Sequence, residues 1–109
     1  MGQAAVDTFQ AIADPSRRQI LRLLSKEGLT INAVAENFEM SRPAVSKHLK
    51  ILHVAGFIAI EERGRERYCS LKKEGFVALQ EWLDYFDGFW NEKLDALEKF
   101  IAETQSNKK

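Results

Sequence analysis

The segment between Thr30 and Phe57 constrains the fold of this chain more than any other stretch. Its apolar residues recur at helical spacing on both sides of the connection Glu39-Met40-Ser41, so the sequence predicts two short helices joined by a tight turn. Thr30 or Asn32 can cap the first helix. The side chains of that helix that we expect to be buried are Val34, Ala35 and Phe38. A short connection fixes the angle between the helices, which is typical of a helix-turn-helix unit over residues 30–57.

The second helix of this segment has one apolar and one polar face. Ser41 is a strong candidate for its N-cap, and Pro43 suits the first helical turn, where its missing N–H costs nothing. On a wheel of about 100° per residue, the residues that share the core-facing side are Val45, Leu49 and Leu52. The opposite side carries small and basic residues, namely Pro43, Ala44, Ser46, Lys47 and Lys50.

This small and basic face suits the major groove of duplex DNA. Lys47 and Lys50 can reach phosphates or guanine edges. Ser46 can hydrogen-bond a base or a phosphate, and the small Ala44 allows close approach. Arg42 lies at the helix start, the end that meets base edges in helix-turn-helix docking. A helical hairpin without this function can show the same pattern. The residues of this segment that we expect to contact DNA are Ser41, Arg42, Pro43, Ala44, Ser46, Lys47 and Lys50.

The distribution of charge supports the same expectation, although the net charge is zero. Residues 41–73 hold 8 basic against 3 acidic side chains, whereas residues 1–40 hold 4 against 5 and residues 74–109 hold 4 against 8. A basic middle with acidic flanks concentrates the attraction for phosphate on one surface. The alternative is that these charges merely solvate one face of the molecule.

Residues 57–71 predict a β-hairpin with a two-residue turn at Gly64-Arg65. The strand pairs that follow from this turn are Glu62 with Arg67, Ile60 with Cys69, and Ile58 with Leu71. The apolar pairs then share one face of the hairpin. We therefore expect Cys69 to be a buried core thiol rather than a redox sensor.

Three arginines cluster at the tip of this hairpin. A hairpin beside a groove-binding helix can act as a wing, with basic side chains on the DNA backbone or in the minor groove. The residues that we expect to do so are Arg63, Arg65 and Arg67. The alternative is a solvated hairpin tip.

Upstream of the helix-turn-helix segment, the sequence predicts two helices, over residues 3–13 and 15–25. Asp14 can cap the second helix, and the proline that follows suits the first helical position. We interpret Arg17 and Arg18 as solvated or salt-bridged surface, with a phosphate contact as the alternative.

From about residue 73 to residue 103 the sequence predicts one long helix with a broad apolar and aromatic surface. A domain of this size cannot cover such a surface from one side, so we expect it to form a subunit interface together with the first helix. A cofactor-binding aromatic box is the alternative. The residues that we expect at the dimer interface are Phe9, Leu79, Trp82, Phe86, Phe89, Trp90 and Leu94.

Three motifs of the chain resemble the winged-helix repressors of the ArsR/SmtB type, namely AIADPSRRQILRLL, SRPAVSKHLKILHVAGFI and the hairpin RGRERYCSL. The resemblance covers nearly the whole chain. It implies a homodimer that reads palindromic operators in double-stranded DNA and represses transcription until a small-molecule or protein inducer relieves it. It also places the groove-reading positions on Arg42, Pro43, Ala44, Ser46 and Lys47.

The chain departs from the metal-sensing members of that type. Those members carry cysteines on the first motif helix, or His, Asp and Glu ligands on the last helix. In this chain, TINAVAENF and residues 74–109 contain neither Cys nor His. His48 and His53 are five residues apart and cannot form a closed Cys/His site with Cys69 in one subunit. We therefore expect a metal-independent member without a cofactor.

Taken together, the sequence predicts a single winged helix-turn-helix domain over residues 1–109, mainly α with a small β-hairpin and a long C-terminal dimerisation helix. The single cysteine, the lack of a signal peptide and the lack of an apolar run of roughly 20 residues indicate a cytoplasmic protein without a membrane partner. The sequence contains no phosphate-binding glycine loop and no nucleophile–base arrangement, which are patterns that would indicate an enzyme. The rival interpretation is a protein-interaction module that docks its aromatic C-terminal helix and binds little DNA.

Overall fold

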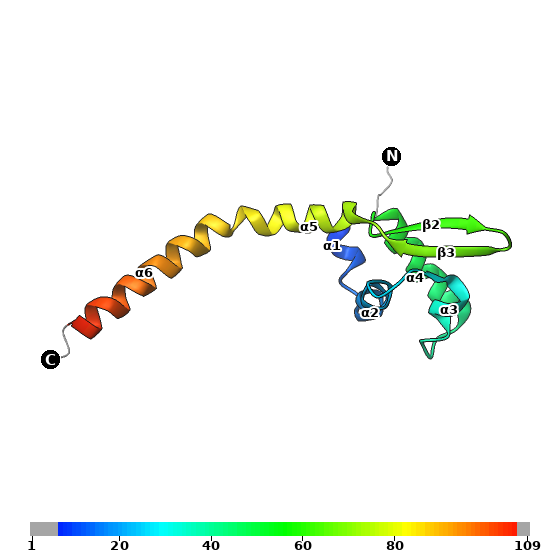
Figure 1. Cartoon of the computed structure of the whole chain (residues 1–109), viewed down its shortest axis with the longest axis horizontal. Coiled ribbons are helices and arrows are strands. Elements are labelled where there is room, and N and C mark those ends of the chain that lie inside the picture. Colours follow the sequence, from blue (N-terminus) through cyan, green and yellow to red (C-terminus); the bar gives the residue numbers. More distant parts are fainter. Residues whose placement is uncertain (1–6, 107–109) are drawn as a thin grey trace. The chain divides into compact units, whose positions relative to one another are not determined.

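The computed structural model describes residues 7–106, which form a mainly helical fold with a small antiparallel sheet. The elements follow in the order α1 (Thr8–Ala11), α2 (Pro15–Leu24), β1 (Leu29–Thr30), α3 (Ile31–Ala35), α4 (Arg42–Val54), β2 (Ile58–Arg63), β3 (Glu66–Leu71), α5 (Lys73–Tyr85) and α6 (Asp87–Ser106) (Figure 1). The chain divides into two compact units, with the boundary between Leu79 and Gln80. The winged helix-turn-helix fold class is confirmed, and the single domain over residues 1–109 stays a prediction.

The helix starts follow the capping residues that the sequence predicts. The Asp14 carboxylate accepts the N–H groups of Ser16 and Arg17 at 2.7 and 3.3 Å, which begins α2. The Thr30 hydroxyl accepts the N–H of Ala33 at 3.1 Å, so Thr30 rather than Asn32 caps α3. Ser41 caps α4. At the far end of α4, Gly56 adopts a φ of 86°, a left-handed conformation that favours glycine after a helix.

The first helix is shorter than predicted. Residues 3–6 of its expected range lie outside the described residues. The described part is the single turn α1, which ends at Ala11, two residues before the expected end. Ala13 already donates to the Gln10 carbonyl in a tighter turn, and the arginines of α2 occupy the carbonyls that follow.

The hairpin has the predicted turn and the predicted register. Ile58 is opposite Leu71, Ile60 is opposite Cys69, and Glu62 is opposite Arg67, with Gly64 in the turn at a φ of 64°. The sequence did not predict β1, whose two residues pair with Cys69 and Tyr68 at the other edge of β3. The sheet therefore has the strand order β1-β3-β2.

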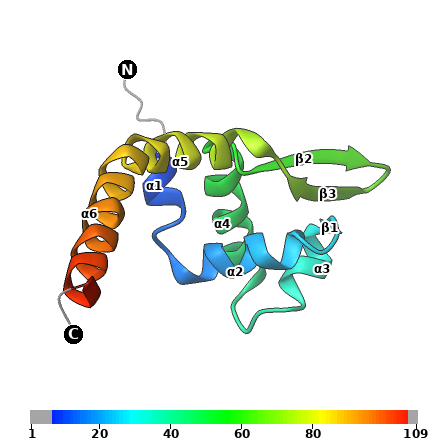
Figure 2. The same cartoon turned by 60° about the vertical axis from the view of Figure 1, so that its left-hand side comes forward.

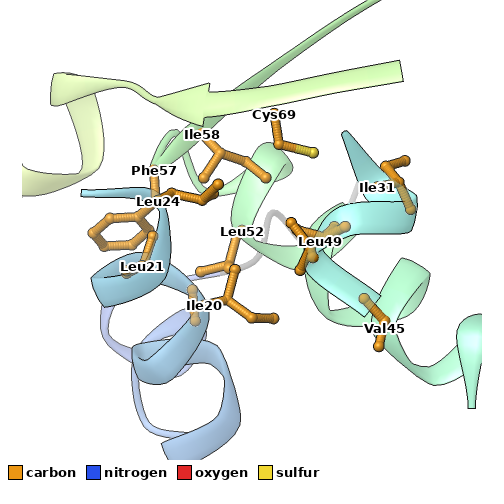
Figure 3. Close-up of a cluster of buried hydrophobic side chains, with 12 residues drawn as sticks. Ile20, Leu21, Leu24, Ile31, Val45, Leu49, Leu52, Phe57, Ile58 and Cys69 are labelled. Atoms are coloured by element: carbon orange, nitrogen blue, oxygen red, sulfur yellow. The ribbon is translucent and has the colours of Figure 1, made fainter. Parts of the chain in front are cut away.

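The core lies where α2, α3, α4 and the sheet meet. In Figure 2, α4 runs between α2 and the β2–β3 hairpin, in agreement with the contacts of both elements with α4. Figure 3 shows Ile58 and Cys69 of the sheet above the side chains of α4. The buried residues of this cluster are Ala11, Ile20, Leu21, Leu24, Ile31, Val34, Val45, Leu49, Leu52, Phe57, Ile58 and Cys69. The predicted core face of α4 is thereby confirmed.

The prediction of one helix over residues 73–103 is wrong, because α5 and α6 are separated at Phe86. The Phe86 N–H donates to the Leu83 carbonyl, a bond three residues back that tightens the last turn of α5. Its carbonyl accepts the N–H of Trp90 and so begins α6. Asp87 and Gly88, which follow the break, both have low helix propensity. None of the helices among residues 7–106 combines the length and the apolar character needed to cross a bilayer.

Candidate nucleic-acid interface

The outward face of α4 is largely exposed to solvent. Arg42, Pro43, Lys47 and Lys50 are exposed, while the smaller Ala44 and Ser46 are half-buried. Within residues 7–106, the ammonium groups of Lys47 and Lys50 make no hydrogen bond or ion pair. The buried residues on the other side of α4 fix which way this face points. The helix therefore presents unpaired positive charge on a surface with little side-chain bulk.

Ser41 has a structural role at the start of this helix. Its Oγ accepts the N–H of Ala44 at 3.2 Å, which satisfies one of the donors that a helix start leaves free. The residue is exposed, so the hydroxyl is accessible from solvent while it caps. Its predicted contact with DNA stays a prediction.

Two of the hairpin arginines meet the start of α4. Arg65 and Arg67 line a small hollow of about 100 Å³ together with Arg42. Thr30 and Asn32, from the start of α3, line the same hollow, as does the acidic Glu66 of β3. Guanidinium groups bind phosphate through paired N–H donors, and hydroxyl and amide groups add further polar contacts. The folded chain thus brings together cations from two separate elements.

Arg63 lies on the other face of the hairpin. Residues two apart on a strand share a face, so Arg63 shares one with Glu61, and Arg67 shares the core side with Cys69. The Arg63 guanidinium donates to the Glu61 carboxylate at 2.6 Å and stacks 4.1 Å from the centre of the Tyr68 ring. The sequence predicted a single cluster of three arginines, but the structure separates Arg63 from the other two.

Two arginines of α2, Arg17 and Arg18, bind main-chain carbonyls. Arg17 donates to the carbonyls of Ala11 at 2.6 Å and Gln10 at 3.1 Å. Arg18 donates to the carbonyls of Ile12 at 2.7 Å and Ala13 at 3.1 Å. These bonds hold the turn after α1 against α2.

Arg17 also reaches α4. Its Nη1 lies 3.2 Å from Nδ1 of His48, and the Asp14 carboxylate is 3.9 Å away. Burial raises the pKa of Asp14, but the N–H groups of Ser16 and Arg17 and the charges of His48 and Arg17 outweigh it, so the pKa lies below its ordinary value. The cluster links the N-terminal turn to the helix that carries the basic face.

The two histidines and the cysteine are each engaged within the fold. His53 Nδ1 lies 3.2 Å from the Ile58 carbonyl oxygen, which accepts a hydrogen bond from the ring N–H, and His48 contacts Arg17. Cys69 is fully buried, and burial raises the pKa of its thiol, with a smaller opposing effect of Arg67. In the part of the chain that the structure describes, no three or more His, Cys, Asp or Glu side chains gather where they could hold a metal ion.

The second unit leaves its apolar residues in solvent. No residue between 80 and 105 is buried, and Trp90 and Leu94 are 57% and 55% exposed. Of the residues predicted at the dimer interface, Leu79 packs in part against the core of the first unit. Phe9, Trp82 and Phe89 are exposed, and Phe86 is half-buried. Their place in an interface stays a prediction.

Comparison with known proteins identifies the family. Residues 14–59 match the model of the bacterial regulatory proteins of the arsR family. The chain is 38% identical over 85 residues to the transcriptional repressor SdpR of Bacillus subtilis, an alignment that covers 78% of this chain and 91% of the repressor. The chain belongs to the ArsR family.

Other members of the ArsR family extend this likeness to the fold. The chain is 36% identical to the HTH-type transcriptional regulator Rv2034 of Mycobacterium tuberculosis, over 85% of this chain and 84% of that protein. The crystal structure of an ArsR family transcriptional regulator matches with a TM-score of 0.72 at 38% identity, over 77% of this chain and 92% of that chain. This ArsR-family chain is therefore a DNA-binding transcriptional regulator and, as predicted, not an enzyme.

The sequence interpretation did not predict that Asn32 lies beside these arginines. Asn32 was considered only as a helix cap, but it is exposed and lines the hollow beside the arginines. A polar residue at the start of the first motif helix was the available signal. The approach of β3 to this helix start, which gives Asn32 its place, depends on the β1–β3 pairing that the sequence did not reveal.

Proposed function

We propose that this regulator is a homodimeric repressor that binds two-fold symmetric DNA through the outward face of α4 and the tip of the β2–β3 hairpin. In this proposal the start of α4 reads base edges, with Arg42, Ala44 and Ser46 facing the groove. Lys47 and Lys50 bind phosphates on either side. As a repressor on the chromosome, the protein would act in the cytoplasm.

The observation that carries this proposal is the gathering of Arg42 with Arg65 and Arg67 around one hollow. A helix that enters a major groove brings the neighbouring hairpin onto the adjacent backbone, where basic side chains add affinity without reading sequence. The exposed basic face of α4 begins at Arg42, which lines this hollow. Arg63 is tied to Glu61, so we assign it a minor part in the contact.

The homodimer is supported by the second unit. A helix of 20 residues is about 30 Å long, and α6 buries none of its apolar side chains in this chain. Helices in proteins owe most of their stability to the packing of an apolar face. We therefore infer that a second copy of the chain covers the apolar surface of α6. In a two-fold symmetric dimer, the two α4 helices enter DNA half-sites that lie one helical turn apart. The operators of this dimer are palindromic because they match its symmetry.

We further propose that the regulation does not depend on a metal ion. The soft ligands of the described chain are already in use, since Cys69 is in the core and the histidines contact Arg17 and the Ile58 carbonyl. In this proposal, a ligand other than a metal ion releases the protein from DNA.

Salt dependence of DNA binding tests the assigned contacts. The logarithm of the binding constant falls with the logarithm of salt concentration by about 0.9 for each phosphate neutralised. We expect a steep slope for the wild type and a slope lower by roughly two for the Lys47→Ala, Lys50→Ala variant, which also binds more weakly on every sequence. Lys26→Ala, at an exposed position at the end of α2, serves as the control and should leave the slope unchanged. Equal slopes for the wild type and the double variant would contradict the assignment, and no salt dependence at all would favour the protein-interaction module.

A further inference from the structure

A second cavity lies beside the proposed DNA contacts, between α4 and the hairpin. It has a volume of about 380 Å³, within the range of roughly 300–1,000 Å³ that small-molecule sites occupy. Its apolar lining includes Leu49 and Val54 of α4 and Ile60 of β2. Leu49 is buried and forms the floor, whereas Val54 is 53% exposed at the rim.

The polar part of the lining carries two cations. Lys50 and Arg67 line the cavity together with the neutral Ser46 and the imidazole of His53, and no acidic side chain does. Within the described residues, the side chains of Lys50 and Arg67 have no ion pair, even though Arg67 lies opposite Glu62 in the strand register. The cavity therefore offers uncompensated positive charge above an apolar floor.

DNA binding alone does not explain this combination. A phosphate of the DNA backbone needs cations at an open surface and gains nothing from an apolar hollow. An apolar hollow is filled favourably by a hydrocarbon or aromatic body, which leaves water on binding. A ligand that matches both the apolar and the cationic side chains of the lining has an apolar body and an anionic end.

We infer that this cavity, the α4–hairpin cavity, binds a small organic anion with an apolar body, such as a medium-chain carboxylate, and that this ligand is an inducer. The second half of the inference rests on the proposed function. Lys50 and Arg67 cannot bind the carboxylate and a DNA phosphate at once, so each ligand lowers the affinity of the other by the same factor.

Methyl NMR of the full chain with sodium octanoate as the probe tests the site without DNA. Octanoate should shift the methyl signals of Leu49 and Ile60, and Lys50→Gln with Arg67→Gln should weaken its binding about tenfold, because charge-assisted hydrogen bonds are lost. These exposed positions allow the variant to fold. Lys47→Gln, on the same helix but outside the cavity, is the matched control and should leave octanoate binding unchanged.

Two comparison ligands make the test specific. Octanol lacks the charge and acetate lacks the apolar body, so both should bind at least tenfold more weakly than octanoate. Equal binding of octanol, or shifts confined to the methyl groups of Leu94 and Leu97 on α6, would overturn the site.

A competition experiment then tests the regulatory half. Octanoate should release wild-type protein from a labelled duplex at concentrations that shift the cavity methyl signals, and acetate should not. Octanoate binding in the cavity without release would overturn the role as inducer. Methyl shifts in a protein that binds no DNA would leave the site standing and contradict the proposed function instead.

Discussion

Arg17 and Arg18 donate hydrogen bonds to main-chain carbonyls. Their donors bind four successive carbonyls of the turn after α1, from Gln10 to Ala13. The sequence interpretation of these arginines as solvated or salt-bridged surface did not identify the carbonyl acceptors. A carbonyl acceptor leaves no mark in the sequence, because every residue carries one.

Asp14 should contribute stability that depends on pH. Because its pKa is lowered in the folded chain, its contribution is present above the ordinary pKa of about 3.9 and is lost as the pH falls through the lowered value. Asp14→Ala should reduce the free energy of unfolding by about 0.5–2 kcal/mol at neutral pH. Asp14→Asn should keep most of the capping and show a weaker loss of stability in acid. Denaturant titrations at neutral and acidic pH measure both effects, and identical pH dependence for wild type and Asp14→Asn would contradict the account.

Cys69 should be unreactive in the folded protein. The thiol is fully buried and its pKa is raised, and both effects suppress the thiolate that reacts with alkylating agents. Iodoacetamide at neutral pH should modify Cys69 only after the chain is unfolded in denaturant. Rapid modification of the native protein would show that the thiol is accessible, and it would contradict the prediction that Cys69 is a core thiol rather than a redox sensor.

At the scale of elements, the hairpin was the best predicted part of the fold. A two-residue turn and alternation of apolar residues leave one register that buries Ile58, Ile60 and Cys69 together, and the observed pairs match it. The two-residue strand β1 has no comparable pattern, since its pairing depends on where α3 packs. The break at Phe86 escaped prediction for a similar reason, because apolar periodicity continues across it.

The contact between α5 and Phe57 can be tested with a matched pair of glycines. A Cβ at Gly75 would lie 2.7 Å from the fully buried Phe57 ring, and Phe76 already packs edge-on against that ring at 5.0 Å between centroids. Gly75→Ala should therefore lower the free energy of unfolding by about 1–3 kcal/mol. A Cβ at Gly88 in α6 meets nothing within 4 Å. Gly88→Ala should be neutral or stabilising by up to about 1 kcal/mol. Thermal unfolding compares the two, and equal stability of Gly75→Ala and wild type would contradict the tight packing.

At the scale of the whole molecule, the orientation of α4 depends on one chain alone, whereas the cover of the aromatic face of α6 depends on a partner. The outward-facing residues of α4 could be predicted from the sequence because the core face of this helix is fixed within one chain, by Val45, Leu49 and Leu52. The partner of the aromatic face on α6 lies outside the chain, so neither the pattern nor the fold of one subunit places it. The second copy remains a proposal that solution experiments decide.

Trp90→Glu should convert the protein to monomers or make it insoluble. Trp90 lies on the apolar side of α6 with Leu94, and a charge buried in an interface without a partner is strongly unfavourable. Asn91→Glu adds the same charge at the next, exposed position and should leave the dimer intact. Sedimentation velocity of both variants separates the outcomes. A soluble Trp90→Glu dimer would refute the place of this face in the interface.

The most direct measurement is fluorescence anisotropy of the purified protein on a labelled duplex from upstream of its own gene, at physiological salt. An unrelated duplex of equal length is the control for sequence specificity. The proposed repressor should bind the upstream duplex saturably, at two chains per site, and tighter than the control by a factor of about 10³ or more. Absence of binding to both duplexes, even at low salt, would contradict the assignment of α4 and the hairpin tip as a DNA-reading surface.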